Sequence, residues 1–181
     1  MDEIDAYEAL GRLVAFLAEE RAEYEGLAVP DDPEERWTLA RSLMNMRLPR
    51  PVPADVVEQQ DAVLRSRIAL AGVTVADTLP ASPLDERLVL WRGDITTLAV
   101  DAIVNAANSK LLGCFIPGHH CIDNAIHTYA GMQLRLACAE LMRAQGHDEP
   151  VGAAPVPPAF NLPSRFVVPP VGPMVPSGVP T

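Results

Sequence analysis

The spacing of apolar residues changes near residue 87, and this change constrains the fold more than any other feature of the sequence. Before it, apolar residues recur at three- and four-residue steps, which is typical of amphipathic helices. Beyond it, the chain carries short apolar runs, RLVLWRGDIT and DAIVNAAN, that end in turn-forming or polar residues. Such runs are typical of strands in an α/β layer fold. We therefore expect a helical N-terminal extension at residues 1–85 and an α/β unit at residues 86–181.

Three helices are expected in the N-terminal extension. The second begins at DDPEERW, where Asp32 can cap the helix and Pro33 suits its first turn, and it ends at the prolines of RLPRPVP. The third covers residues 55–71 and ends at Gly72. Residues that share one face of the first helix are Ile4, Tyr7, Leu10, Val14 and Leu17. Apolar faces on all three helices predict one acidic bundle.

The α/β unit continues with IDNAIHTYAGMQLRLACAELMRAQG at residues 122–146, which has helical spacing throughout. A strand, a loop and a helix in this order place the loop at the carboxyl end of a strand, where α/β proteins bind ligands. After Glu149, ten of the 32 residues are proline, which offers no N–H to a sheet ladder. We expect this tail to be irregular or to hold a damaged strand, with a strand entry only at FNLPSRFVV.

Charge and cysteine content narrow the functional classes. The formal net charge of −10 argues against a protein that binds the phosphate backbone of nucleic acid, since such proteins need clustered Lys and Arg. The acidic start MDEIDAYEAL is unlike a secretory signal, and no apolar run approaches the roughly 20 residues of a membrane helix. Three cysteines, an odd number, favour reduced thiols over disulfides. These observations predict a cytoplasmic protein whose partners are neither nucleic acid nor a membrane.

The segment LLGCFIPGHHCIDNAIH at residues 111–127 holds two of the three cysteines and three of the four histidines. Thiolate and imidazole are preferred zinc ligands, and Cys114, a histidine and Cys121 would fill three positions, leaving a fourth for water or substrate. An open position of this kind is typical of catalytic zinc. By spacing alone, either His119 or His120 could be the ligand. The alternative is a pair of buried structural cysteines with an exposed histidine.

The helix that follows this segment adds further polar candidates. Asp123 and Asn124 fall in its first turn, where free N–H groups suit a phosphate, although an Asp there can simply stabilise the helix dipole. His127 lies four residues after Asp123 and shares its face. We expect His127 to face the core with a backbone hydrogen bond, and Cys138 to be a core residue.

Several of these motifs together resemble the macrodomain family. They are WRGDIT at 91–96, AIVNAAN at 102–108 and CIDNAIHTYAG at 121–131. GCFIPGHHC stands where ordinary macrodomains have a glycine-rich loop, and this replacement is similar to the zinc-dependent subfamily. MNMRLPRP at 44–51 is similar to the subfamily's helical extension, so the resemblance covers roughly residues 1 to 175. It implies a three-layer α/β sandwich preceded by that extension.

The resemblance also implies a function: hydrolytic removal of ADP-ribose from modified proteins, with a zinc ion as cofactor. The subfamily's pattern P-x-H-x-C matches this sequence if His119, and not His120, is the ligand. The implied metal ligands are Cys114, His119 and Cys121. ADP-ribose esterified to Asp or Glu would be the natural substrate, because ester cleavage benefits from a Lewis acid. A lipoyl carrier protein is the modified partner that family analogy suggests.

The family's other functional positions carry over to five residues. Asp94 would bond the adenine amino group, and Ile95 would line the same pocket. Asn108 would contact the distal ribose, whereas Asn105 would brace the loop. Asp123 matches the acidic residue beside the distal ribose. Asn108 and Asp123 are therefore the implied catalytic residues.

The sequence departs from the family in its last segment. Pro157 stands where the family has threonine, and Pro169 and Pro170 stand where it usually has His-Thr. The family usually continues past the end of this chain, so we expect an incomplete, C-terminally truncated sandwich without the second phosphate loop. Two alternatives to the hydrolase therefore remain. One is a non-catalytic ADP-ribose-binding module, for which GDIT and NAAN suffice; the other is an inactive fragment that acts as an interaction protein.

Overall fold

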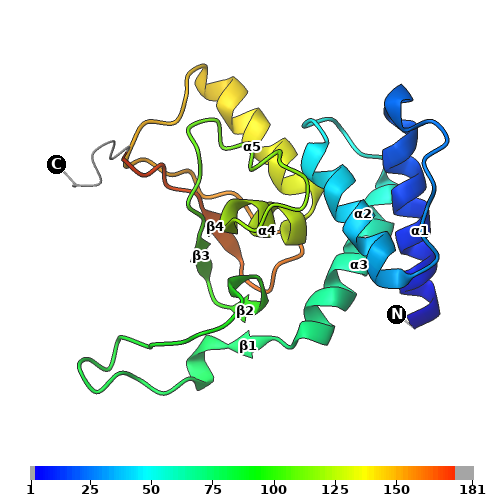
Figure 1. The fold of residues 1–181 in the computed structure, drawn as a ribbon. Coiled ribbons are helices and arrows are strands. Elements are labelled where there is room, and N and C mark those ends of the chain that lie inside the picture. Colours follow the sequence, from blue (N-terminus) through cyan, green and yellow to red (C-terminus); the bar gives the residue numbers. More distant parts are fainter. Residues whose placement is uncertain (1–2, 174–181) are drawn as a thin grey trace.

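Three helices form a bundle at one end of the molecule (Figure 1), in a computed structural model that describes residues 3–173. They are α1 (Glu3–Glu19), α2 (Pro33–Met46) and α3 (Ala54–Ala71). Leu13, Val14 and Leu64 are fully buried in their shared core, so the expected bundle is confirmed. Of the face predicted for the first helix, Leu10, Val14 and Leu17 are buried, Tyr7 is partly exposed, and the side chain of Ile4 lies outside the described residues.

The ends of these helices follow the local signals in the sequence. One carboxylate oxygen of Asp32 accepts hydrogen bonds from the backbone N–H groups of Glu34 (3.0 Å) and Glu35 (2.9 Å), so α2 is capped as predicted. Pro33 is its first residue. Helix α3 ends at Gly72, whose φ of 88° is favourable for glycine. No helix in the described range combines the length and apolarity needed to cross a bilayer.

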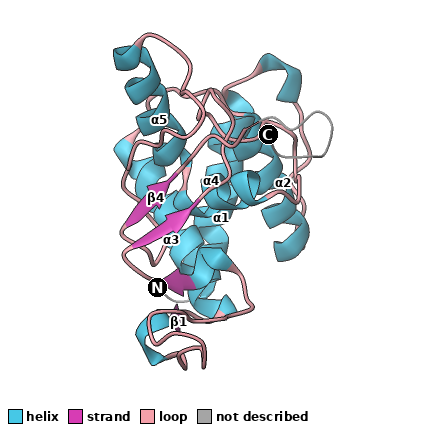
Figure 2. Cartoon of the chain, turned by 90° about the vertical axis from the view of Figure 1, so that its left-hand side faces the viewer, coloured by secondary structure: helices cyan, strands magenta, loops and turns pink. Residues whose placement is uncertain are grey.

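Two small parallel sheets lie beside the bundle. Strands β3 (Ala102–Val104) and β4 (Phe166–Val168) pair with Ile103 opposite Val167, and they lie side by side in Figure 2. Strands β1 (Thr74–Val75) and β2 (Leu98–Ala99) form the second pair. Short 3₁₀ helices cover Ala22–Tyr24, Ala76–Thr78 and Ile95–Thr97. The strands expected in DAIVNAAN and FNLPSRFVV are thus confirmed, and so is a mixed α/β fold.

Helices α4 (Ile122–Ala130) and α5 (Met132–Gln145) cover the β3–β4 pair. Ile103, Ile126 and Leu134 meet in a second core, to which Cys138 belongs as predicted. The prediction of one continuous helix over residues 122–146 is wrong, because the chain breaks at Gly131. Gly131 has a φ of 98°, and a Cβ atom there would lie 2.6 Å from the side chain of Gln60 on α3.

The prediction of a strand in RLVLWRGDIT is also wrong. Residues 87–92 are irregular, and Leu90 is 94% exposed. Among the described backbone hydrogen bonds, none involves residues 89–92, and a strand requires a ladder partner. The segment then turns into the 3₁₀ helix Ile95–Thr97.

The proline-rich tail contributes one short strand, as expected. Strand β4 ends at Val168, directly before Pro169. Pairing nevertheless continues, because the carbonyl of Pro170 accepts a hydrogen bond from the N–H of Ala107 (3.2 Å). Proline lacks a donor but keeps its acceptor, so it can serve one side of a ladder. Residues 174–181 of the expected tail lie outside the described residues.

Candidate metal and ADP-ribose site

The candidate metal ligands lie on the loop that joins β3 to α4. Leu111 anchors the start of this loop in the core, with a φ of 56° that is unusual for a residue other than glycine. Gly113 follows with a φ of 76°, and a Cβ atom there would lie 2.8 Å from the ring of His127. The loop therefore crosses closely over α4, and Gly113 is needed for both its conformation and its lack of a side chain.

Cys114, His119 and Cys121 converge on one another. Their ligand atoms all lie within 4.8 Å of each other, and Cys114 Sγ is 3.4 Å from His119 Nδ1. A tetrahedral zinc would hold a sulfur and a nitrogen about 3.6 Å apart, so this donor set fits zinc. Both cysteines are half-buried and His119 is exposed, which leaves one side of the cluster open. His120 is also exposed and is not a member of the cluster.

Cys121 has a second structural role, because it caps α4. Its Sγ accepts a hydrogen bond from the backbone N–H of Asn124 (3.4 Å). Burial raises the pKa of the Cys121 thiol, and the N–H of Asn124 opposes this rise. The pKa of the thiol stays raised overall, so the end of the helix offsets only part of the effect of burial on the thiolate form that metal binding needs.

Asp123 is buried in the first turn of α4, beside the candidate ligands. Its Oδ1 accepts a hydrogen bond from Asn105 Nδ2 (2.8 Å), so Asn105 ties the end of β3 to the start of α4. Burial raises the pKa of Asp123, whereas the Asn105 hydrogen bond and the charge of Arg135 lower it. The side chain is thus held in place in a setting that favours its protonated form more than water does.

His127 lies next to the same carboxylate, with its Nε2 3.6 Å from Asp123 Oδ1. Burial, followed by the charge of Arg135, lowers the pKa of His127 to about 3, so the ring is neutral at pH 7. The prediction that it faces the core is confirmed. The predicted backbone hydrogen bond is wrong, because Nδ1 is buried with no partner among the described residues.

The other predicted pocket residues lie on two nearby segments. Asp94 is exposed and caps the 3₁₀ helix Ile95–Thr97 through a hydrogen bond from the N–H of Thr96 (2.9 Å). Ile95 packs against the second core. Asn108 is exposed at the start of the loop, where its amide donates to the carbonyl of Gly113 (3.4 Å). Asn105 and Asp123 are therefore in direct contact, whereas the described hydrogen bonds do not join Asp94 to either of them.

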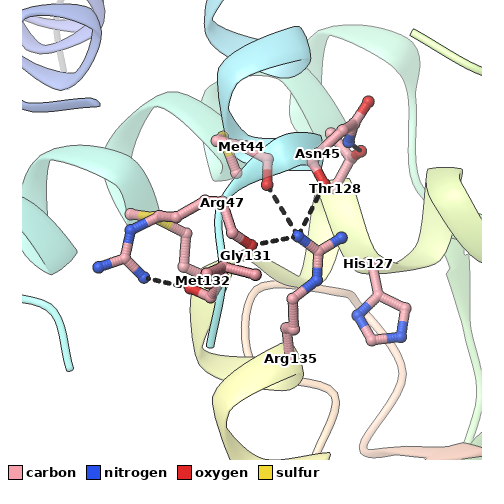
Figure 3. A pocket seen from close by; sticks show the side chains of 9 residues that line it. Met44, Asn45, Arg47, His127, Thr128, Gly131, Met132 and Arg135 are labelled. Carbon is pink, nitrogen blue, oxygen red and sulfur yellow. Dashed lines mark hydrogen bonds between the residues drawn. The ribbon is translucent and has the colours of Figure 1, made fainter. Parts of the chain in front are cut away.

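Sequence reasoning missed the residues that hold the loop from outside. Arg41 and Asn45 on α2, Arg135 on α5, and Asn124 on α4 all bond to backbone groups between Cys114 and Cys121. Arg135 also donates to the carbonyls of Met44, Asn45 and Arg47 at the end of α2, as Figure 3 shows. A usable signal was the position of Asn45 within MNMRLPRP, four residues after Arg41 and on the same helix face.

The chain is similar in sequence to several known proteins. The model of the Macro domain matches residues 104–180. The match covers less than half of the chain. A protein-ADP-ribose hydrolase from Treponema medium is 48% identical over 165 residues, which cover 90% of this chain and 63% of that protein. One from Staphylococcus aureus (strain MRSA252) is 43% identical over 164 residues, covering 90% and 60%. The chain therefore spans about 60% of the length of these curated relatives.

Solved macro domain structures are also similar over part of the chain. The Oceanobacillus iheyensis macrodomain with ADP is 40% identical, covers 48% of this chain and 44% of its own, and has a TM-score of 0.42. The Trypanosoma brucei macrodomain in complex with ADP-ribose is 30% identical, covers 74% and 59%, and has a TM-score of 0.46.

Proposed function

We propose that this chain is part of a zinc-dependent hydrolase that removes ADP-ribose from modified protein side chains. The observation that carries the proposal is the convergence of Cys114, His119 and Cys121 beside the Asn105–Asp123 pair. The relationship to proteins named protein-ADP-ribose hydrolase supports it, with 48% identity to one of them. We also propose that the part of the chain after residue 85 belongs to an incomplete three-layer α/β sandwich, preceded by the helical extension at residues 1–85.

The three ligands would hold zinc with one side open. When bound there, zinc would polarise a substrate oxygen or lower the pKa of a water molecule to about 7. ADP-ribose esters of Asp or Glu suit this chemistry, because their cleavage requires charge to develop on a carbonyl oxygen. A modified carrier protein in the cytoplasm is the partner we propose.

The chain's own residues would bind and orient the substrate and move a proton. Asp94 would accept a hydrogen bond from the adenine amino group, beside Ile95. The first turn of α4 would face the diphosphate with its free N–H groups. Asn108 would contact the distal ribose, and Asp123 would exchange a proton through its free oxygen, since Asn105 engages only Oδ1. A raised pKa suits Asp123 to that exchange near neutral pH.

A second candidate is an ADP-ribose-binding module without turnover. The exposed positions of Asp94 and Asn108 favour it, because neither needs a metal to meet a ligand. Asp94→Ala should weaken ADP-ribose binding by about 1–3 kcal/mol in calorimetry under either function, since both use this hydrogen bond. Unchanged affinity would contradict the role of Asp94 in both.

The deciding experiment measures bound zinc and the release of ADP-ribose from an aspartate-modified protein. Purified protein should hold close to one zinc per chain, and Cys121→Ala should lose both zinc and release. Cys138→Ala is the matched control, because Cys138 is a core cysteine that is not a member of the ligand cluster. Folded wild-type protein without zinc would contradict the hydrolase, and ADP-ribose binding without release would favour the binding module.

A further inference from the structure

The backbone of the metal loop is held from outside at four points between its first and last ligands. The anchoring side chains come from three different helices, and two of them belong to α2 of the N-terminal extension. The anchored groups are the carbonyl of Cys114, the carbonyl of Ile116, the N–H of Gly118 and the carbonyl of His119. Such anchors restrict where the ligand atoms can lie before any metal binds.

Asn45 fixes the turn in the middle of the loop. Its side chain is 1% exposed, and its Oδ1 accepts a hydrogen bond from the N–H of Gly118 (3.0 Å). Its Nδ2 donates to the buried hydroxyl of Thr128 on α4 (2.9 Å). Because both ends of the amide are engaged, its orientation is determined. Gly118 has a φ of 60° and lies next to His119, so Asn45 controls the turn from which that ligand projects.

Arg41 lies one helical turn before Asn45 and reaches the ligand itself. Its Nη2 donates to the carbonyl of His119 (3.1 Å) and to Asn124 Oδ1 (3.0 Å). Asn124 is fully buried, donates to the carbonyl of Ile116 (3.1 Å), and gives its backbone N–H to Cys121 Sγ (3.4 Å). Arg41 therefore links the backbone of one candidate ligand to the residue that contacts another.

The end of α2 is itself held firmly, so it can serve as a fixed reference. Arg135 is buried, and its Nη1 donates to the carbonyls of Met44 (3.1 Å), Asn45 (2.8 Å) and Arg47 (2.7 Å). Its guanidinium also lies 4.3 Å from the ring centre of Phe115 in the metal loop. Figure 3 shows Arg135 reaching from α5 to these three carbonyls.

We propose that Arg41 and Asn45 are positioning residues for the metal site, so that the helical extension sets how tightly the Cys/His loop holds zinc. This inference rests on the proposed zinc site. Metal affinity depends on ligand positions to within about 0.2 Å, and residues that orient ligands typically contribute 10- to 100-fold to metal affinity. Without the two anchors the loop would lose order and would have to regain it upon binding.

The test compares zinc affinity, zinc release rate and the absorption spectrum of bound cobalt in the full chain. Arg41→Gln and Asn45→Ala should each weaken zinc binding about 10- to 100-fold, speed its release and alter the cobalt spectrum. Asn45→Asp is the second variant at this position, because it keeps the shape and Oδ1 but loses the donor to Thr128; it should give a smaller change. Gln60→Ala is the matched control, since Gln60 is a buried amide on the extension that does not contact the loop.

The outcomes separate this inference from the proposed function. Weaker zinc binding in the α2 variants, with wild-type binding in Gln60→Ala, supports the inference. Wild-type zinc affinity and release in folded Arg41→Gln and Asn45→Ala overturn it and leave the hydrolase intact. A folded wild-type chain that binds no zinc overturns both. An equal loss in Gln60→Ala also overturns it, because general stability would then explain the effect.

Discussion

Two of the polar junctions between the helical extension and the rest of the protein use similar hydrogen bonds but differ in what they hold in place. At the first, Arg41 and Asn45 on α2 bond to the backbone of the metal loop. At the second, Gln60 on α3 accepts a hydrogen bond from the N–H of Met132 (2.8 Å) and donates to Gln133 on α5 (2.7 Å). Asp61 lies beside it and belongs to the same junction.

The second junction holds more hydrogen bonds than the first. Asp61 Oδ1 accepts hydrogen bonds from Gln60 (3.0 Å), Gln133 (2.9 Å) and Asn161 (2.6 Å). These partners lie on helices and on a segment next to β4, whereas the partners at the first junction lie on a loop. Buried polar groups stabilise a fold only when they are satisfied. We therefore expect damage at the second junction to lower stability, and damage at the first to change the metal site.

The largest effect should come from Gly131→Val, which breaks the second junction. At a φ of 98° a β-branched residue is strained, and its Cβ would lie 2.6 Å from Gln60 and Gln133. We expect a loss of about 3 to 4 kcal/mol in the free energy of unfolding, measured with urea. Gly146→Ala is the control, because Gly146 has a positive φ but nothing within 4 Å of its Cβ position. Equal losses would show that strain alone, not the junction, is responsible.

The next largest effect should come from low pH, which destabilises the fold by protonating His127 near the first junction. Its pKa is about 3 in the folded chain, below the ordinary 6.5, so the unfolded chain binds more protons between these values. The contribution of the neutral His127 ring to the free energy of unfolding is fully present above pH 6.5 and is lost as pH falls toward 3. The loss is on the order of 3 kcal/mol at pH 4. Urea unfolding of wild type and His127→Gln across this range measures it. A variant with the same pH slope as wild type would contradict the buried neutral ring.

Gln60→Ala should have a smaller effect, confined to stability. It leaves the N–H of Met132 without its partner and removes a donor from Asp61, which typically costs about 1–3 kcal/mol. Thermal unfolding measures the loss of stability, and zinc titration checks that zinc affinity is unchanged. If the variant kept wild-type stability but lost zinc, the second junction would determine metal binding and would not determine stability.

The smallest effect should come from Lys110→Ala, which removes a polar contact outside both junctions. Lys110 Nζ lies 2.6 Å from Asp148 Oδ1, with both side chains largely exposed. Solvent screens such pairs, so we expect no measurable change in unfolding temperature or zinc affinity. A clear loss of zinc affinity would mean that the loop depends on surface contacts as well as on α2.

Local signals in the sequence predicted the helices and the ligand cluster. Asp32 and Gly72 act within one turn of the helices that they delimit. Cys114, His119 and Cys121 lie within eight residues, so their convergence needs only a turn. Features that depend on contacts between distant parts of the sequence were not predicted, because such local signals do not contain them. The helix breaks at Gly131 because Gln60 packs there, and residues 87–92 form no strand because no described segment pairs with residues 89–92.

The anchors of the metal loop belong to this non-local class. Arg41 contacts His119 across 78 residues, and Asn45 contacts Gly118 across 73. The residue types did not predict these contacts, since arginine and asparagine on a helix are usually solvated. The roles of Asp94, Asn108 and Asp123 toward ADP-ribose stay predictions, as does the zinc ion itself.

The contact between Arg135 and the end of α2 has a consequence for folding. The last carbonyls of a helix lack partners within it, and here Arg135, 88 to 91 residues further along the chain, donates hydrogen bonds to carbonyls at this end. Helix α2 therefore cannot complete its own terminus until α5 has docked. We expect the helical bundle and the α/β part to unfold in one cooperative transition, with coincident curves from circular dichroism and from Trp37 fluorescence in a Trp91→Phe variant.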